Sequence, residues 1–180
     1  MEINAKDLWV KGRASLRAQW HLRSATEVAR TARLTGRPAI NNQGTLIVRD
    51  RVQLISTVAT LELATGPDGV LDIGERSLVN YGTSLSALLL VKIGPRCQIG
   101  TYCLLMDNDF HRVEPERRLE RPESKPIVLE ENVWLGARVV VMSGVTIGEG
   151  SVIGAGSVVT RDIPPRTIAA GVPAKVIRDL

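Results

Sequence analysis

Residues 129–164 read LEENVW, LGARVV, VMSGVT, IGEGSV, IGAGSV and VTRDIP, and so repeat one pattern every six residues. Each unit begins with a branched aliphatic residue and has a small or β-branched residue at its fifth position. Neither the helical period of 3.6 residues nor the strand period of 2 produces a strict six. The pattern instead predicts a coil with three flat faces, in which each unit forms one short strand and one turn. The first position is expected to fill the interior of this prism. Glycines at the second position are expected to tolerate the backbone of the turn: Gly136, Gly148 and Gly154.

The same register continues upstream with IGERSL from Ile73, IGPRCQ from Ile93 and IGTYCL from Ile99. Cys97 and Cys103 occupy the fifth position of their units, where a small apolar side chain belongs. Both cysteines are therefore predicted to be core residues, and neither a disulfide nor a metal site is expected from them.

A charged excursion interrupts the repeat at residues 107–126, which read DNDFHRVEPERRLERPESKP. A degenerate unit, IVRDRV, begins at Ile47, and its distance from Ile73 is not a multiple of six, so the early coils are expected to carry insertions. A polar loop ejected from a regular scaffold is a usual place for chemistry. The alternative is a plain insertion between coils.

Composition agrees with one all-β domain. Aromatic residues make up 3% of the 180-residue chain, and the apolar content resides in aliphatic side chains, which suits a narrow and repetitive interior. We place the β-helix at residues 39–180 and a basic capping segment, predicted to form a short helix, at residues 1–38. The chain shows no signal-peptide core, and no apolar run approaches the roughly 20 residues that span a bilayer. These features predict a soluble protein of the cytoplasm.

The positive charge is concentrated at the start of the chain. Residues 1–38 contain eight Lys or Arg and three acidic residues, so the net charge of +4 resides in this segment. With Trp9, Leu16, Trp20 and Val28, the segment fits an amphipathic helix that rests on anionic lipid at the inner face of a membrane. The solvated face of a capping segment is the favoured alternative. Nucleic acid is not expected as a partner, because no recognised motif accompanies the charge.

The repeats resemble those of the hexapeptide acyltransferases, whose fold is a left-handed parallel β-helix. From Asn132 onward, NVWLGARVVVMSGVTIGEGSVIGAGSVVTRDIPPRTIAAGVPAKVIRDL is similar to the C-terminal half of maltose, galactoside and nodulation-sugar O-acetyltransferases. The upstream combination of NYG and DNDFH favours the polysaccharide and lipopolysaccharide acetyltransferases. The resemblance implies transfer of an acetyl group from acetyl-CoA to a sugar or to a polysaccharide or lipopolysaccharide precursor. It also implies a homotrimer with active sites between subunits, and no metal.

Acetyl transfer to a hydroxyl needs a base, because the hydroxyl proton must leave as the oxygen attacks. A neutral histidine suits this role near pH 7. The chain has two histidines, His21 in the basic segment and His111 directly after DNDF, and both chemistry and resemblance favour His111. In the resembling enzymes a glutamate about a dozen residues further on assists the base. Glu123 lies at that distance and Glu120 is close to it.

Polar residues near this histidine are candidates for contact with the acceptor. Asp107, Asn108 and Asp109 are expected to bind sugar hydroxyls or to shape the loop. Asn80, within LVNYG, resembles the asparagine that faces the acetyl group or the acceptor in relatives, and its amide is suited to a thioester oxygen. A turn asparagine is the alternative.

The resemblance also implies a binding surface for CoA along the last coils. Trp134 is expected to flank the pantetheine arm, and the small Ala137 and Ala155 to allow its close approach. Charged and polar groups near the adenosine phosphates are expected from two further pairs, Thr160 with Arg161 and Lys175 with Arg178.

Three other functions are compared with the sequence features. A γ-type carbonic anhydrase shares the fold but needs three histidine ligands for each zinc, more than the two histidines of this chain. A non-catalytic glycan-binding β-helix would need neither a histidine loop nor a CoA-like tail. An N-acetyltransferase acting on an amino sugar or a nucleotide sugar would use the same base and stays open, as does the length of the acyl group.

Overall fold

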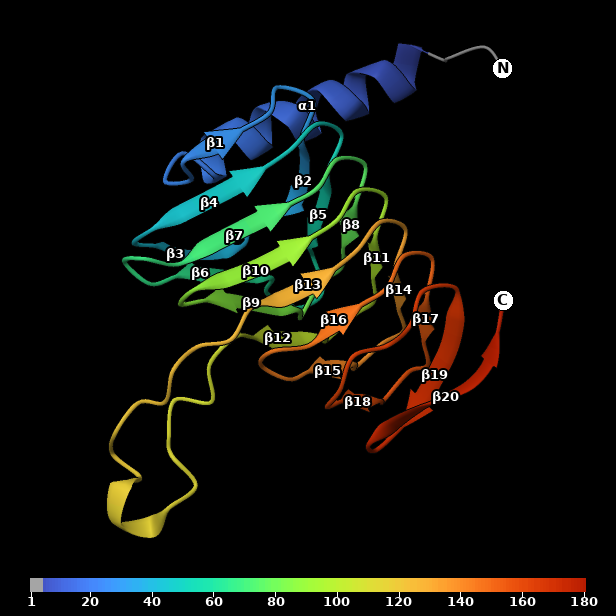
Figure 1. Ribbon diagram of the computed structural model, residues 1–180. Helices are drawn as coiled ribbons and strands as arrows, with labels where there is room; N and C mark the ends of the chain where they lie inside the picture. Colours follow the sequence, from blue (N-terminus) through green and yellow to red (C-terminus); the bar gives the residue numbers. More distant parts are fainter. Residues whose placement is uncertain (1–4) are drawn as a thin grey trace.

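The computed structural model of the chain describes residues 5–180, with side chains from residue 10. It is a β-solenoid in which three parallel sheets form the faces of a triangular prism, with one helix at the N-terminal end (Figure 1). This confirms the fold predicted from the period of six. No helix among residues 5–180 is long and apolar enough to cross a membrane.

Each sheet collects every third strand of the chain, because each coil adds one strand to each face. The first sheet, sheet A, contains β1 (Glu27–Val28), β4 (Thr45–Val48), β7 (Val70–Ile73), β10 (Leu90–Ile93), β13 (Ile127–Leu129) and β16 (Thr146–Ile147). Sheet B contains β2 (Arg33–Gly36), β5 (Gln53–Ser56), β8 (Leu78–Val79), β11 (Gln98–Ile99), β14 (Trp134–Leu135), β17 (Val152–Ile153), β19 (Thr167–Gly171) and β20 (Ala174–Asp179). Sheet C contains β3 (Ala39–Asn42), β6 (Glu62–Thr65), β9 (Ser84–Ala87), β12 (Leu104–Met106), β15 (Val140–Val141) and β18 (Val158–Val159).

The strands shorten along the prism. Pairs in the early coils, such as β4 with β7, have four residues in register, whereas late pairs such as β14 with β17 have two. Strand β20 departs from the pattern, since it runs antiparallel to β19 and closes the C-terminal end.

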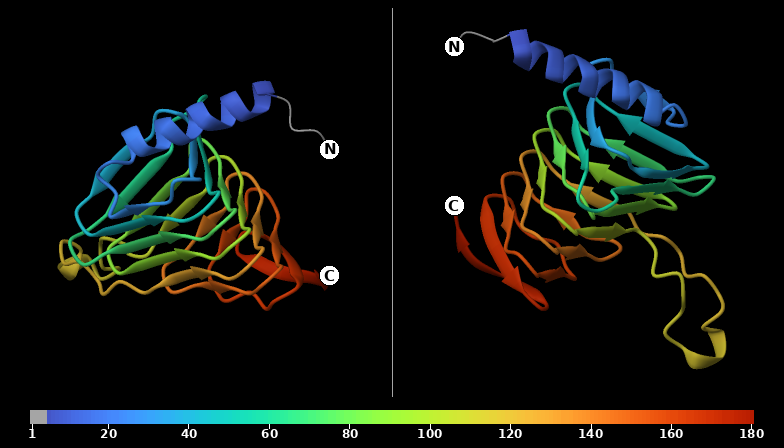
Figure 2. Two further views of the ribbon diagram at one scale, coloured as in Figure 1. Left: turned by 90° about the horizontal axis from the view of Figure 1, so that it is seen from above. Right: turned by 180° about the vertical axis from the view of Figure 1, so that it is seen from behind.

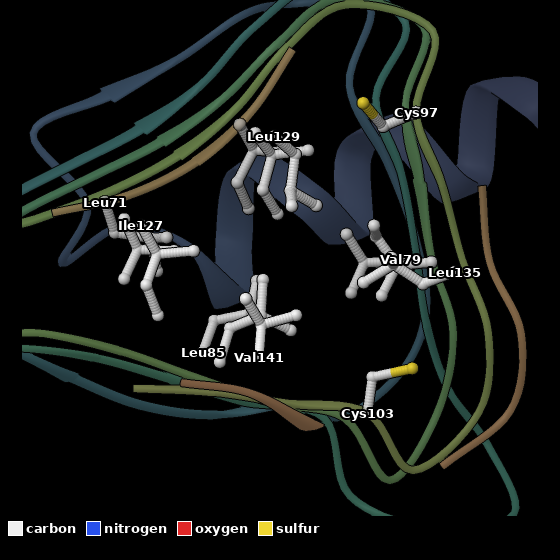
Figure 3. Close-up of a cluster of buried hydrophobic side chains, with 14 of the residues drawn as sticks. Leu71, Val79, Leu85, Cys97, Cys103, Ile127, Leu129, Leu135 and Val141 are labelled. Atoms are coloured by element: carbon white, nitrogen blue, oxygen red, sulfur yellow. The ribbon is translucent and has the colours of Figure 1, made fainter. Parts of the chain in front are cut away.

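The core lies along the axis of the prism and consists of aliphatic side chains stacked coil on coil (Figure 3). Along sheet A, Leu46, Leu71, Val91 and Ile127 stand in one column, each in register with the next and each buried. Identical surroundings at each level explain why the sequence must repeat the same residue type. The first and fifth positions of every unit from residue 129 onward are buried as predicted.

Glycine occupies the second position of the repeat units for a different reason from the one expected. At Gly136 the backbone is not left-handed, but an added Cβ would lie 2.7 Å from the backbone nitrogen of Ala155 on the next coil. The second position is therefore glycine because adjacent coils approach closely there. The left-handed backbone falls instead at the fourth position, which is Asn132, Arg138, Gly144, Gly150 and Gly156 in successive units.

Helix α1 (Ala5–His21) covers the N-terminal end of the core, with Ala18 and, just after it, Leu22 fully buried. The β-helix starts earlier than the predicted boundary at residue 39, because β1 and β2 already pair with β4 and β5. The segment 1–38 thus contains both the cap and the first coil.

Cys97 and Cys103 are buried in the core, as predicted (Figure 3). Burial raises the pKa of the Cys97 thiol to about 11 and raises that of Cys103 as well. Because the folded state disfavours the thiolate, burial of the neutral thiols contributes fully to the free energy of unfolding below about pH 8.5. This contribution is lost as the pH rises through about 11.

We expect thiol reagents at pH 8 to leave both cysteines unmodified in the folded protein and to modify both after unfolding, since the thiolate is the reactive form. Absorbance of a released chromophore measures the reaction. Modification of the native protein at the rate of a free thiol would contradict this assignment.

Candidate active site

The loop of residues 107–126 leaves the prism after β12 and carries a short 3-10 turn, η1 (Pro115–Arg117). Asp107 fixes its root. Its carboxylate, 1% exposed, accepts hydrogen bonds from three consecutive backbone N–H groups, those of Leu88, Leu89 and Leu90, at 2.8, 2.7 and 2.7 Å. Of the two expectations for Asp107, binding of sugar hydroxyls is therefore wrong, because its oxygens are buried and occupied; it shapes the loop.

Asn108 joins the two arms of the loop in the same way. Its Nδ2 donates to the Pro122 carbonyl at 2.8 Å and to Ser124 Oγ at 2.9 Å, and its Oδ1 accepts from the Phe110 N–H at 2.7 Å. The side chain is buried, so Asn108 also shapes the loop and does not face an acceptor. Asp109 is exposed and remains the acceptor candidate of this run.

His111 follows a tight turn in which its N–H donates to the Asp109 carbonyl at 2.7 Å and Phe110 has a positive φ of 61°. Its Nδ1 lies 2.8 Å from the Arg118 carbonyl oxygen. A carbonyl only accepts, so Nδ1 carries the proton in this hydrogen bond. In the neutral ring, Nε2 then keeps its lone pair and is exposed with the side chain. The loop thus holds the imidazole in one orientation, with a ring nitrogen that can accept a proton.

The orienting group of this base is not the predicted glutamate. Glu120 pairs with Arg117 at 2.7 Å and lies 3.4 Å from Arg112, and the hydrogen bond from Arg117 lowers the pKa of its carboxyl. Glu123 is exposed, and among the residues that the structure describes it has no hydrogen-bond or ion-pair partner. Neither glutamate contacts His111. Sequence reasoning missed the Arg118 carbonyl because every residue has one.

The loop projects away from the prism (Figures 1 and 2), and the hydrogen bonds of His111 stay within the loop. It leaves the prism at the edge between sheets C and A. Thr160 and Arg161, exposed after β18, lie at that same edge, because the chain next bridges from Ile163 to Ile147.

Asn80 lies at a different edge of the prism, the one between sheets B and C. Asn80 follows β8 there, is half-buried, and its Oδ1 accepts from the Tyr81 N–H at 3.0 Å. Next to it, the rings of Tyr81 and Tyr102 meet edge to face at 5.7 Å, and the Arg138 guanidinium lies 5.8 Å from the Tyr102 ring. Sequence analysis did not single out this aromatic edge, since its members are 21 to 57 residues apart.

The candidates for CoA binding on the late coils partly share this edge. Ala137 and Ala155 lie one above the other, and the Gly156 N–H donates to the Ala137 carbonyl at 2.8 Å. Trp134 on β14 is 55% exposed. Its register continues through Val152 and Ile168 to Arg178 on β20, with Lys175 on the same strand.

One chain therefore divides the predicted site between two edges of the prism. His111, Thr160 and Arg161 belong to one edge. Asn80, Ala137 and Ala155 belong to the other, and Trp134 lies on sheet B beside them. Among residues 5–180, no three His, Cys, Asp or Glu side chains gather as metal ligands. A single chain thus carries His111 on the projecting loop and Trp134 near Ala137 and Ala155 on the late coils, and does not bring the two groups together.

Comparison with known proteins points to one class. The family described as bacterial transferase hexapeptide (six repeats) matches residues 126–161. A Schizosaccharomyces pombe protein that bears the provisional name of an acetyltransferase, C18B11.09c, is 35% identical over 145 residues, which cover 74% of this chain and 70% of that protein.

Galactoside O-acetyltransferase of Escherichia coli K12 is 42% identical over 109 residues. That match covers 60% of this chain and 53% of the enzyme, so the chain spans about half the length of that relative. A solved galactoside acetyltransferase in complex with coenzyme A superposes with a TM-score of 0.62 at 28% identity, over 99% of this chain and 85% of that one.

Proposed function

The chain belongs to the hexapeptide-repeat acetyltransferase family, and from that premise we propose that it transfers an acetyl group from acetyl-CoA to a hydroxyl of a sugar or of a polysaccharide or lipopolysaccharide precursor. The observation that carries the proposal is the hydrogen bond from His111 Nδ1 to the Arg118 carbonyl, which leaves Nε2 as an exposed base on the projecting loop. Galactoside O-acetyltransferase among the relatives favours a sugar acceptor.

The proposed reaction follows from this base. His111 Nε2 takes the proton of the acceptor hydroxyl while its oxygen attacks the thioester carbonyl carbon. The C–O bond forms, the C–S bond breaks, and the CoA sulfur leaves with the electron pair and receives the proton from the imidazolium. The Arg118 carbonyl holds the ring throughout and stabilises its charged form through the Nδ1–H.

We further propose that the active sites form between the subunits of a homotrimer. Support comes from the projection of the loop and from the division of the candidate residues between two edges of one prism. In a ring of three parallel prisms, one edge of each chain meets the other edge of its neighbour. His111 of one subunit would then approach Asn80 and Trp134 of the next.

In this arrangement the late coils hold CoA. The exposed indole of Trp134 offers apolar contact to the pantetheine arm, and the small side chains of Ala137 and Ala155 allow the arm to approach the backbone closely. Lys175 and Arg178, both exposed on β20, would face the phosphates, as would Thr160 and Arg161 of a neighbouring chain.

The first test of the function is release of free thiol from acetyl-CoA in the presence of sugars, amino sugars and nucleotide sugars. Turnover on a hydroxyl acceptor supports the proposal. Turnover restricted to amines would replace it with N-acetylation, and no turnover with any member of the panel would contradict the choice of acceptor class.

We expect CoA to stabilise the protein by mass action and Trp134→Ala to weaken its affinity by about tenfold or more, because an aromatic contact is lost. Calorimetry and thermal shift measure both effects. Trp20→Ala, which removes another exposed indole, the one on α1, is the matched control and should leave CoA affinity unchanged. A folded protein that shows no response to millimolar CoA would count against the function as a whole.

A further inference from the structure

Helix α1 lies across the N-terminal end of the prism, at the opposite end from the C-terminus, with one side packed on β2 and the other turned away from the molecule (Figure 2). Ala18 is fully buried on the inner side. On the outer side, Leu16 is 72% and Trp20 69% exposed. Residues four apart are neighbours on one helix face, so the helix holds two large apolar side chains together in solvent.

The same surface is basic. Residues 8–26 contain four Lys or Arg and not one Asp or Glu. Lys11, Arg17 and Arg23 are exposed, and the Arg23 guanidinium lies 5.5 Å from the centre of the Trp20 ring. We call Leu16, Trp20, Arg17 and Arg23 the cap surface. An apolar pair surrounded by cations without acids nearby is unlike a merely solvated helix face, in which apolar residues are not paired outward.

We propose that the cap surface docks on an anionic lipid bilayer, with α1 parallel to the membrane plane. Tryptophan is favoured at the level of the headgroups, leucine beneath it, and lysine and arginine at lipid phosphates. A nucleic acid backbone would satisfy the cations but would leave the Leu16 side chain without an apolar contact, so the chemistry favours lipid. Because no described helix can span a bilayer, the contact is peripheral.

Two apolar side chains and a few cations give weak binding in a single chain. If the trimer of the proposed function forms, cyclic symmetry places three cap surfaces at one end and in one plane. Binding of the second and third helices is then intramolecular and strengthens the whole attachment. This strengthening depends on the trimer, whereas the docking itself does not.

Sedimentation with vesicles tests the docking without any acceptor or catalysis, so it fails separately from the acetyltransferase proposal. The full chain is mixed with vesicles of phosphatidylcholine alone or with about 30% phosphatidylglycerol, at low and high salt. We expect pelleting with the anionic vesicles at low salt, weaker pelleting at high salt, and none with the neutral vesicles.

Two double variants separate the parts of the cap surface. Leu16→Ser with Trp20→Ser, and Arg17→Gln with Arg23→Gln, should each weaken vesicle binding about tenfold or more, because cations near the surface contribute about fivefold each and the apolar pair is lost. Since all four side chains are exposed, melting temperatures should stay unchanged.

Val58→Ser with Arg76→Gln removes an exposed valine and arginine elsewhere on the prism and should bind as the native chain does. The proposal is overturned by absence of pelleting, by equal binding to neutral vesicles, or by double variants that bind normally. Duplex DNA that competes for the chain as effectively as anionic vesicles would also overturn it.

Discussion

His111→Ala is expected to lower kcat by about 10²–10⁴-fold on the best acceptor, because the general base acts in the transition state on the acceptor proton. The affinity for CoA should stay nearly unchanged, since the candidates for donor binding lie on the coils and not on the loop. Steady-state kinetics and calorimetry measure the two quantities. An interaction made only in the transition state lowers kcat and kcat/KM together.

His21→Ala is the control, because it removes the other histidine of the chain from the far end of the molecule. If His111→Ala retained native turnover, His111 would be a surface histidine and the assignment wrong. If it lost CoA affinity as well, the loop would be part of the donor site.

A mixture of subunits tests where the site lies. Chains carrying His111→Ala and chains carrying Trp134→Ala, expressed together and assayed at low CoA, should recover activity that neither has alone. In a random mixture about one quarter of the inter-subunit sites would keep both residues. Recovery would not occur if each site came from one chain.

Asp107→Ala is expected to lower the free energy of unfolding by about 3–5 kcal/mol, because three backbone N–H groups lose a charged acceptor at once. Chemical denaturation measures the change. Asp109→Ala, two residues further on and exposed, should change stability by less than about 0.5 kcal/mol. Equal stability of the two variants would show that the hydrogen bonds from residues 88–90 contribute little.

Asp107→Ala should also reduce turnover, because the loss of its three side-chain hydrogen bonds loosens residue 107. The carbonyl of the same residue accepts from Ser143 Oγ at 2.9 Å and from the Lys125 N–H at 3.0 Å, so a shift of residue 107 disturbs both ends of the loop. A loop released from this root no longer holds His111 at one place.

The fold could be predicted because the prism gives every coil the same environment. A buried position that recurs at each level, as at Leu135 and Ile153, leaves a period that the sequence must repeat. Where strands are longer and insertions intervene, the period fades. The sequence therefore predicts a start of the β-helix at residue 39, which is later than strands β1 and β2. The role of the second-position glycines was missed for a related reason: a close approach between coils leaves no mark on the local sequence.

A candidate site can be proposed from the sequence only where the chemistry depends on residue type. A base for acetyl transfer restricts the choice to two histidines, and the charged loop favours His111. The group that orients it is a backbone carbonyl, which no pattern of side chains reveals. The sequence cannot distinguish a sugar ligand from a structural anchor at Asp107, because an aspartate in this loop could serve either role. Its burial and the three N–H groups that bond to its carboxylate distinguish them.

The shortening of the strands along the prism has a kinetic consequence. In a solenoid each coil contacts only its neighbours, so folding can begin wherever a few coils are most stable together and then spread outward. Four residues in register per strand pair make the early coils, around β4, β7 and β10, the favoured nucleus. The coils from β14 onward, with two, would add one at a time to a template already formed. The surface we assign to CoA is thus the last part of the molecule to assemble and, in reverse, the first to fray.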